Sequence, residues 1–234
     1  KLQWKVDWAM RWFTFDVDFE MYGKDLTESA ILSSKVCKTL GKTPPSGFAY
    51  ELFLDEKGEK ISKSKGNGIT IDEWLNYASP ESLSLYMYQN PKRAKKLYSD
   101  VVPKAVDEYL SLIEKFPDQK DKDKLSNPVW HVHNGEPPKE KIVMSFSMLL
   151  NLVGSSNADD KKILWKFINR FHKDAKPESN PILDSLTEHA IKFFKDKLKP
   201  NKIYKEPNEQ EKKALKNLAA NIEKINENMP PEEI

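Results

Sequence analysis

The residues best suited to chemistry lie in residues 60–68, which have the sequence KISKSKGNG. Glycines let the backbone approach a ligand closely, and serine hydroxyls can donate hydrogen bonds to phosphate oxygens. Lysine ammonium groups can neutralise the charge that builds up on a transferring phosphoryl group and its leaving pyrophosphate. This composition indicates an anion-binding loop, although a solvated flexible turn would have the same composition. The order of the residues is not that of a P-loop or of a dinucleotide-binding turn.

The elements ahead of this loop are mixed α/β. Trp4, Trp8 and Trp12 recur at helical spacing and predict a helix that faces a core. Residues 17–21 alternate as a strand would, and the four-residue spacing of apolar residues at 32, 36 and 40 predicts a helix that stops at Gly41. Residues 47–54 are apolar and predict a second strand, with side chains 48, 50, 52 and 54 on one face. Strand, helix and strand fit part of a parallel sheet, so we expect partner elements upstream.

After the loop the chain becomes helical. Residues 70–73 (TIDE) form a capping box, in which the hydroxyl and the carboxylate each satisfy a backbone N–H. Ser79-Pro80 begins the next helix, and residues 118–124 are expected to be an exposed connector. The predicted inner faces of the later helices are Val102, Val106, Tyr109, Ile113 and Phe116; Ile163, Leu164, Phe167, Ile168 and Phe171; Leu183, Leu186, Ala190 and Phe194; and Leu215, Leu218, Ala219, Ile222 and Ile225.

The bulk composition is that of a soluble globular protein, with 38% hydrophobic and 32% charged residues among 234. No run approaches the roughly 20 apolar residues that cross a bilayer, so no membrane association is expected. A single cysteine, Cys37, excludes an internal disulfide and fits a reducing, cytoplasmic location. The chain begins without methionine or a secretory signal, so we expect it to be a fragment that lacks the amino-terminal half of a longer protein.

Two lysine-rich stripes suit contacts to phosphate, although a solvated helix face would have the same composition. The first stripe, residues 92–104, holds Lys92, Arg93, Lys95, Lys96 and Lys104 against Asp100. The second stripe, residues 192–205, holds Lys192, Lys195, Lys197, Lys199, Lys202 and Lys205 against Asp196.

The loop resembles the Lys-Met-Ser-Lys-Ser (KMSKS) motif of class I aminoacyl-tRNA synthetases, including the Lys-Gly-Asn that often follows it. Residues 2–12 (LQWKVDWAMRW), 23–25 (GKD), 50–51 (YE), 128–135 (PVWHVHNG) and 199–202 (KPNK) are similar to the class I lysyl enzymes. The resemblance covers essentially the whole chain. It implies a mainly α fold, in which a short α/β remnant of a Rossmann-type catalytic domain (1–55) precedes the KMSKS loop with a connecting helix (56–78) and an all-helical anticodon-binding domain (79–234).

The same resemblance implies site roles for several residues. Lys60 and Lys63 would be catalytic, with Lys63 stabilising the transition state for adenylation, and Trp4 and Tyr50 would line the lysine pocket. The residues implied in ATP binding are Lys60, Ile61, Ser62, Lys63, Ser64, Lys24 and Asp25. For Trp4 and Tyr50, ordinary aromatic core packing is the alternative, just as a solvated turn is for the loop.

Two departures from the family are visible. Leu26 stands where many members carry histidine, so that contact is not carried over. No His-Ile-Gly-His-type motif is present, because the histidines are His131, His133, His172 and His189, all in the helical part. His131 and His133 lack the further ligands that a metal site needs, so no metal site is expected. Without the histidine motif, this chain alone is expected to be inactive.

The complete enzyme implied by this resemblance is a lysine–tRNA ligase. Its substrates would be lysine, ATP with Mg²⁺ and the lysine tRNA, with no tightly bound cofactor. Two alternatives remain open from the sequence: a stand-alone tRNA-binding module without catalysis, and a class I synthetase for another amino acid such as glutamate.

Overall fold

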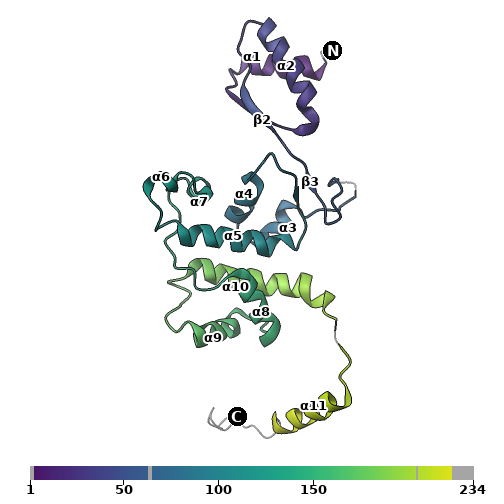
Figure 1. Cartoon of the computed structure of the whole chain (residues 1–234), viewed down its shortest axis with the longest axis vertical. Coiled ribbons are helices and arrows are strands. Elements are labelled where there is room, and N and C mark those ends of the chain that lie inside the picture. Colours follow the sequence, from purple (N-terminus) through teal and green to yellow (C-terminus); the bar gives the residue numbers. More distant parts are fainter. Residues whose placement is uncertain (1–2, 63–64, 204, 223–234) are drawn as a thin grey trace. The chain divides into compact units, whose positions relative to one another are not determined.

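The computed structural model describes residues 3–62, 65–203 and 205–222 and is mainly helical (Figure 1). The chain divides into two compact units, residues 1–199 and 200–234. The first part of the first unit contains α1 (Trp4–Thr14), β1 (Phe19–Gly23), the 3₁₀ turn η1 (Lys24–Leu26), α2 (Thr27–Thr39), β2 (Ser46–Tyr50) and β3 (Phe53–Leu54). No helix among the described residues is both long and apolar enough to cross a bilayer.

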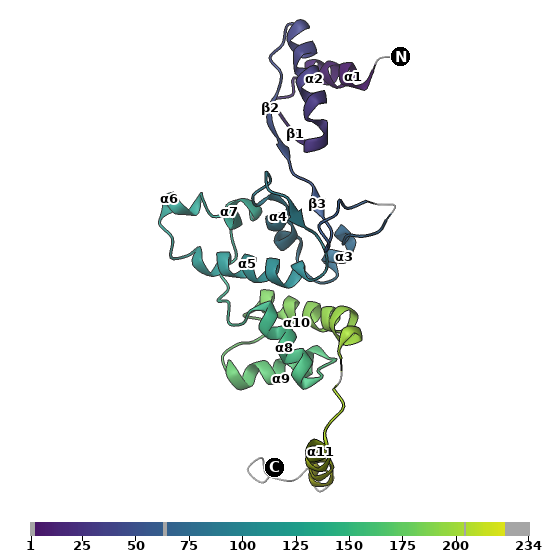
Figure 2. The same ribbon diagram turned by 45° about the vertical axis from the view of Figure 1, so that its right-hand side comes forward.

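β1, α2 and β2 form the predicted parallel unit. The two strands pair in parallel, from Phe19 opposite Ser46 to Gly23 opposite Tyr50. Gly47 is required for this pairing, because a Cβ there would lie 1.8 Å from the carbonyl oxygen of Glu20. Figure 2 shows α1 and α2 close together beside these strands.

The inner face of this unit is small. Its buried apolar residues are Ala9, Trp12 and Cys37, and the Trp12 indole donates to the Glu20 carboxylate at 2.8 Å. The predicted helix is confirmed as α2, but Leu32 and Leu40 are 43% and 48% exposed. The other face of β1, on the side away from Glu20, is also apolar and open to solvent, since the Phe19 side chain is 56% exposed.

The prediction of one strand over residues 47–54 is wrong. The chain leaves the first sheet after Tyr50, where the Glu51 N–H donates to the Pro91 carbonyl at 2.9 Å. Residues 53–54 then form β3, which pairs in parallel with β4 (Lys95–Lys96). β4 lies within residues 79–234, so that segment is not purely helical. β4 supplies the edge with which β3 pairs.

The rest of the first unit packs around one large apolar core that extends from Ile69 to Phe193, with Trp74, Phe146 and Phe193 its largest fully buried side chains. Its elements are α3 (Ile71–Leu75), α4 (Pro80–Tyr88), β4, α5 (Val101–Lys115), α6 (Asp121–Lys124), α7 (Pro128–Val132), α8 (Phe146–Ser156), α9 (Lys161–Phe171), α10 (Pro181–Phe193), the π turn η2 (Phe194–Leu198) and the 3₁₀ turn η3 (Lys199–Asn201).

The predicted inner faces are confirmed in part. Val102, Val106, Tyr109 and Ile113 of α5 are buried, whereas Phe171 of α9 is 72% exposed and Ile163 is 40% exposed. Trp165 takes the inner place on α9 and donates to the Asp184 carboxylate at 3.0 Å. On α10 the predicted Leu183, Leu186 and Ala190 are buried, and Phe193, three residues after Ala190, is buried with them. The predicted Phe194, where the π turn begins, is only partly buried against the same core.

Two predicted helix starts are confirmed. Thr70 accepts from the Glu73 N–H, and Ser79 accepts from the Ser82 N–H. At the start of the last helix, Asn208 and Glu211 cap each other. The other predicted hydrogen bond of the capping box at Thr70, in which the Glu73 carboxylate accepts from a backbone N–H, is replaced. That carboxylate instead accepts from Lys197 Nζ at 2.5 Å.

The second unit contains α11 (Glu209–Ile222). Its predicted apolar stripe faces solvent, since Leu215, Leu218 and Ile222 are each more than half exposed. Ile225, the last member of the predicted stripe, lies outside the described residues.

Candidate functional site

The lysine-rich loop grows out of a tight turn that follows β3. Leu54 forms an antiparallel bridge with Lys60, and the Asp55 N–H donates to the Glu59 carbonyl at 2.8 Å. Gly58 adopts φ +85° in this turn, a conformation that L side chains rarely adopt. The turn therefore places Lys60, at the start of the loop, beside Leu54 of β3.

Asp55 and Asn67 close the base of the loop. One oxygen of the buried Asp55 carboxylate accepts from the Glu59 N–H at 2.8 Å, and the other accepts from Asn67 Nδ2 at 2.7 Å. Asn67 Oδ1 in turn accepts from the Ser62 N–H at 3.0 Å. Backbone N–H donation from Glu59 lowers the pKa of Asp55, and Asn67 adds to this effect against the opposing cost of burial. The aspartate is therefore ionised at neutral pH and ties both ends of the loop together.

Ile61 anchors the apolar side of the loop. It is half-buried, and a Cβ at Gly68 would lie 2.7 Å from its Cδ1 atom, so its side chain rests directly on that glycine. Lys65 is exposed and pairs with Glu59 at 3.4 Å. Lys63 and Ser64 lie outside the described residues.

The carboxyl end of β1 faces this loop. Lys60 Nζ lies 3.9 Å from Asp25 Oδ2, and Lys24 Nζ donates to Glu51 Oε1 at 2.9 Å. Gly23 allows this arrangement, because a Cβ there would lie 2.6 Å from Asp25 Oδ1. The structure thus brings together Lys24, Asp25 and Lys60. Ligands bind at the carboxyl ends of parallel strands, so this is a reasonable place for a nucleotide.

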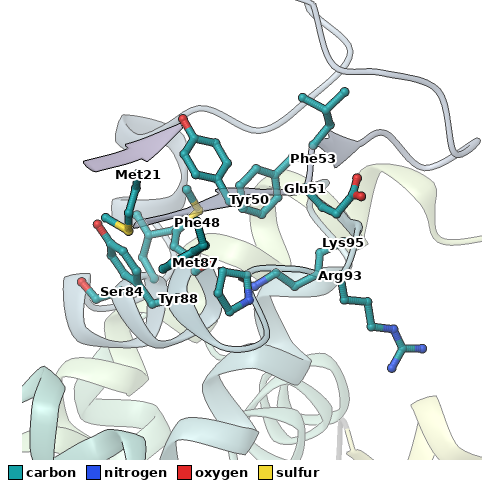
Figure 3. Close-up of a pocket in the computed structure, with 13 residues that line it drawn as sticks. Met21, Phe48, Tyr50, Glu51, Phe53, Ser84, Met87, Tyr88, Arg93 and Lys95 are labelled. Carbon is teal, nitrogen blue, oxygen red and sulfur yellow. Dashed lines mark hydrogen bonds between the residues drawn. The ribbon is translucent and has the colours of Figure 1, made fainter. Parts of the chain in front are cut away.

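Tyr50 and Trp4 have different surroundings. Tyr50 lines a cavity of about 470 Å³ with Met21 and Phe48 on one side and Met87 on the other (Figure 3). Trp4 is 48% exposed and stacks on Trp8 at 5.2 Å between ring centroids. It is not among the residues that line this cavity, so the structure does not bring the two aromatic side chains into one pocket.

The histidines differ in burial, with His133 and His189 partly buried in the helical part and His131 exposed. His133 shares a 2.9 Å hydrogen bond with the Tyr109 hydroxyl, and His131 Nε2 lies 2.8 Å from the Leu125 carbonyl oxygen. Burial lowers the pKa of His133 and of His189, and it raises the pKa of Tyr109. Within the described residues, no three His, Cys, Asp or Glu side chains lie close enough together to hold a metal ion.

Residues 1–136 match the family described as "tRNA synthetases class I (K)". The chain belongs to this family. This class I (K) chain is 51% identical over 218 residues to a lysine–tRNA ligase of Roseobacter denitrificans, covering 93% of the chain and 41% of that relative. It is 50% identical over 220 residues to the Rickettsia rickettsii (strain Sheila Smith) ligase, covering 93% and 42%. Against the Rickettsia bellii ligase it is 48% identical over 236 residues, covering 100% and 45%.

The chain therefore spans less than half the length of the curated relatives it matches. Sequence reasoning did not select two residues that shape this class I (K) site, Asp55 and Glu51. Asp55 stands between an apolar strand and a Gly-containing turn, which is where a loop-closing carboxylate is common. Glu51 offers no comparable signal, because its pairing with Lys24 depends on how the chain turns after β2.

Proposed function

We propose that this chain is the carboxy-terminal part of a cytoplasmic lysine–tRNA ligase. The observation that carries the proposal is the joint presence of class I (K) family membership and a KMSKS-like loop beside the carboxyl end of a parallel strand pair. Similarity to relatives named lysine–tRNA ligase favours lysine over glutamate as the amino acid. Residues 1–55 would complete a Rossmann-type catalytic domain, and residues 79–234 would bind the anticodon.

The reaction would have two steps. An oxygen of the lysine carboxylate attacks the α-phosphorus of ATP, and the bond to pyrophosphate breaks to leave lysyl-adenylate. A hydroxyl of the terminal tRNA ribose then attacks the lysyl carbonyl carbon, and AMP leaves. Catalysis of the first step is mainly positioning and charge stabilisation, which are roles for Lys60, Lys63 and the ATP-bound Mg²⁺.

The ordered base of the loop supports this proposal. Asp55 and Asn67 hold the ends of the loop in place, and Lys63, which lies between these ends in the sequence, would contact the phosphates. Lys60 and Lys24 already lie beside Asp25 and Glu51 at the strand end, where the nucleotide would sit. Tyr50 would contribute one wall of the lysine pocket, and its ring could stack on the alkyl stem or the ammonium of the substrate.

The helical part would bind tRNA through basic surface. Lys195 and Lys199 line a cavity of about 570 Å³ beside Phe194, and Lys92 and Arg93 are exposed. Phosphate contacts of this kind give affinity that falls as salt rises.

The decisive experiment uses the full-length enzyme with Lys63→Ala and, as its control, Lys65→Ala. Loss of the Lys63 charge should cost on the order of 3 kcal/mol of transition-state stabilisation, or about a hundredfold in the rate of lysine-dependent ATP–pyrophosphate exchange. Exchange is measured with and without lysine tRNA, and with glutamate in place of lysine. An unchanged rate in Lys63→Ala removes the proposed role, and exchange supported by glutamate alone overturns the assignment to lysine. The isolated chain is expected to show no exchange.

A further inference from the structure

The end of α4 presents an exposed aromatic side chain. Tyr88 is 64% exposed and has no ring or hydrogen-bond partner among the described residues. It lines two cavities at once: the 470 Å³ cavity next to β2 and a second one of about 730 Å³ between α4 and α7. An aromatic ring of this size is usually placed in contact with something, because leaving it in water forfeits its burial energy.

A lysine holds this helix end in place. Lys95 Nζ donates to the carbonyls of Tyr86, Met87 and Gln89, at 3.1 Å for Met87 and 2.5 Å for Gln89. These are carbonyls that a helix carboxyl end leaves without partners. Gln89 is also fixed from the other side, since its Nε2 donates to Glu108 of α5 at 2.7 Å. The backbone on both sides of Tyr88 is therefore held, which fixes the point on the surface from which its ring projects.

The second cavity has the side chains that recognise a nucleobase. His131 and Tyr88 both line it, and Gln89, Asn90 and Ser126 supply amide and hydroxyl groups to its wall. Aromatic faces stack on unpaired bases, and amides can bond to their edges. Two exposed cations, Lys92 and Arg93, follow directly after the turn at Asn90. In Figure 3, which shows the first cavity, the Arg93 guanidinium points away from that cavity.

We infer that this groove, defined by Tyr88, Asn90 and His131, binds an unpaired nucleotide of the tRNA. The two cations lie beside the first cavity, which Tyr88 also lines: Arg93 lines that cavity and Lys92 Nζ lies 5.9 Å from the ring centroid of Phe48. Tyr88 stacks on the base, and the two cations contact the adjoining phosphates. The inference rests on the proposed function, which supplies a tRNA as partner. It goes further by placing an RNA contact outside both the loop and the α8–α10 region. Exposed cations beside a stacking ring favour RNA over a peptide, because a peptide carries no regular row of negative charge.

The test measures binding of lysine tRNA and of a short single-stranded oligouridylate to the full-length enzyme, by fluorescence anisotropy across a salt series. Tyr88→Ala should weaken tRNA binding about 5- to 150-fold, the range for loss of one stacked base, and should lose most oligouridylate binding. Tyr88→Phe keeps the ring and should bind within about twofold of wild type. Arg93→Gln should lower the slope of log affinity against log salt by about one, whereas Lys115→Gln, at the far end of α5, should leave it unchanged.

The outcomes separate the two proposals. Wild-type tRNA affinity in Tyr88→Ala, with the melting temperature unchanged, overturns the groove assignment while tRNA binding by the enzyme stands, and would leave the groove to a protein partner. Equal weakening by Tyr88→Phe also overturns stacking as the cause. If the wild-type enzyme binds tRNA no better than an unrelated RNA and shows no lysine-dependent exchange, the proposed function fails first.

Discussion

Two lysine-rich segments of this chain use the same side chain in opposite ways. In the loop, Lys60 and Lys65 have side chains that are 60% and 63% exposed, and their nearest acids are 3.9 and 3.4 Å away. In the segment of β4, Lys95 is partly buried and donates to three backbone carbonyls. Burial lowers the pKa of Lys95, and the nearby Glu108 partly offsets this.

The difference shows that lysine density in a sequence does not predict a phosphate-binding surface. A lysine is free to meet a ligand only where its ammonium group remains in water. Once an ammonium lies over orphan carbonyls, it becomes a structural part of the helix end. The first stripe therefore contains a structural residue, Lys95, between the exposed residues Arg93 and Lys96.

The sharpest test of this comparison is Lys95→Met beside Lys65→Met. Removing the Lys95 ammonium leaves partly buried carbonyls without a donor, so unfolding free energy should fall by about 2–3 kcal/mol. Lys65→Met should change the unfolding free energy by less than about 0.5 kcal/mol, since substitutions of exposed side chains seldom have a larger effect. Urea denaturation of the full-length protein measures both. Equal effects of the two substitutions would remove the distinction between the segments.

The second stripe offers a smaller contrast. Lys197 bridges to Glu73 at 2.5 Å and sits over the Tyr77 ring, whereas Lys195 lines the 570 Å³ cavity. Lys197→Met should cost about 1 kcal/mol of unfolding free energy, because the pair is partly exposed. Lys195→Met should leave stability unchanged and weaken tRNA binding instead. Thermal melts and tRNA affinities, measured on the same two variants, distinguish these roles; a reversed result would assign Lys197 to the RNA.

The histidines give a further comparison of buried with exposed side chains, with the smallest expected effect on stability. Burial lowers the pKa of His133 and His189 below 6.5, although the charge of Glu81 opposes this at His133, and that of Glu188 does so at His189. As the pH falls, the unfolded chain therefore takes up protons at a higher pH than the folded chain does. The free energy of unfolding keeps its full value above about pH 6.5 and falls as the pH drops toward the lowered pKa values. A His133→Gln, His189→Gln double variant should show a flatter fall between pH 7 and pH 5 than wild type. The exposed control, His131→Gln, should not show this flatter fall. Equal slopes of unfolding free energy against pH in wild type, the double variant and the control would contradict the assignment.

Much of the fold was predictable because local signals agreed with it. The strand–helix–strand unit follows from alternating and four-residue apolar spacings, and the helix starts follow from Thr70 and Ser79. Lys60, Lys24 and Asp25 were selected by resemblance, and the structure brings them to one strand end. The role of Lys63 stays a prediction.

The misses share a cause. Tertiary pairing redirected an element whose local sequence was ambiguous. Residues 51–54 are apolar enough to continue β2, but β4 offered an edge to Phe53 and Leu54. On α9, both Trp165 and Phe171 are large and apolar, and only the position of Asp184 on α10 selects Trp165 for the inside.

By itself, the sequence determined the family and the order of most helices, because these depend on neighbours a few residues apart. Tertiary structure alone decided which charged groups stay in water. The partners of Lys95, Lys197 and Asp107 come from other elements of the fold: two carbonyls of α4 and that of Gln89 after it, the Glu73 carboxylate, and the N–H groups that begin α8. The energy of a charged side chain depends on the dielectric and the donors around it, and both are set by segments far away along the chain.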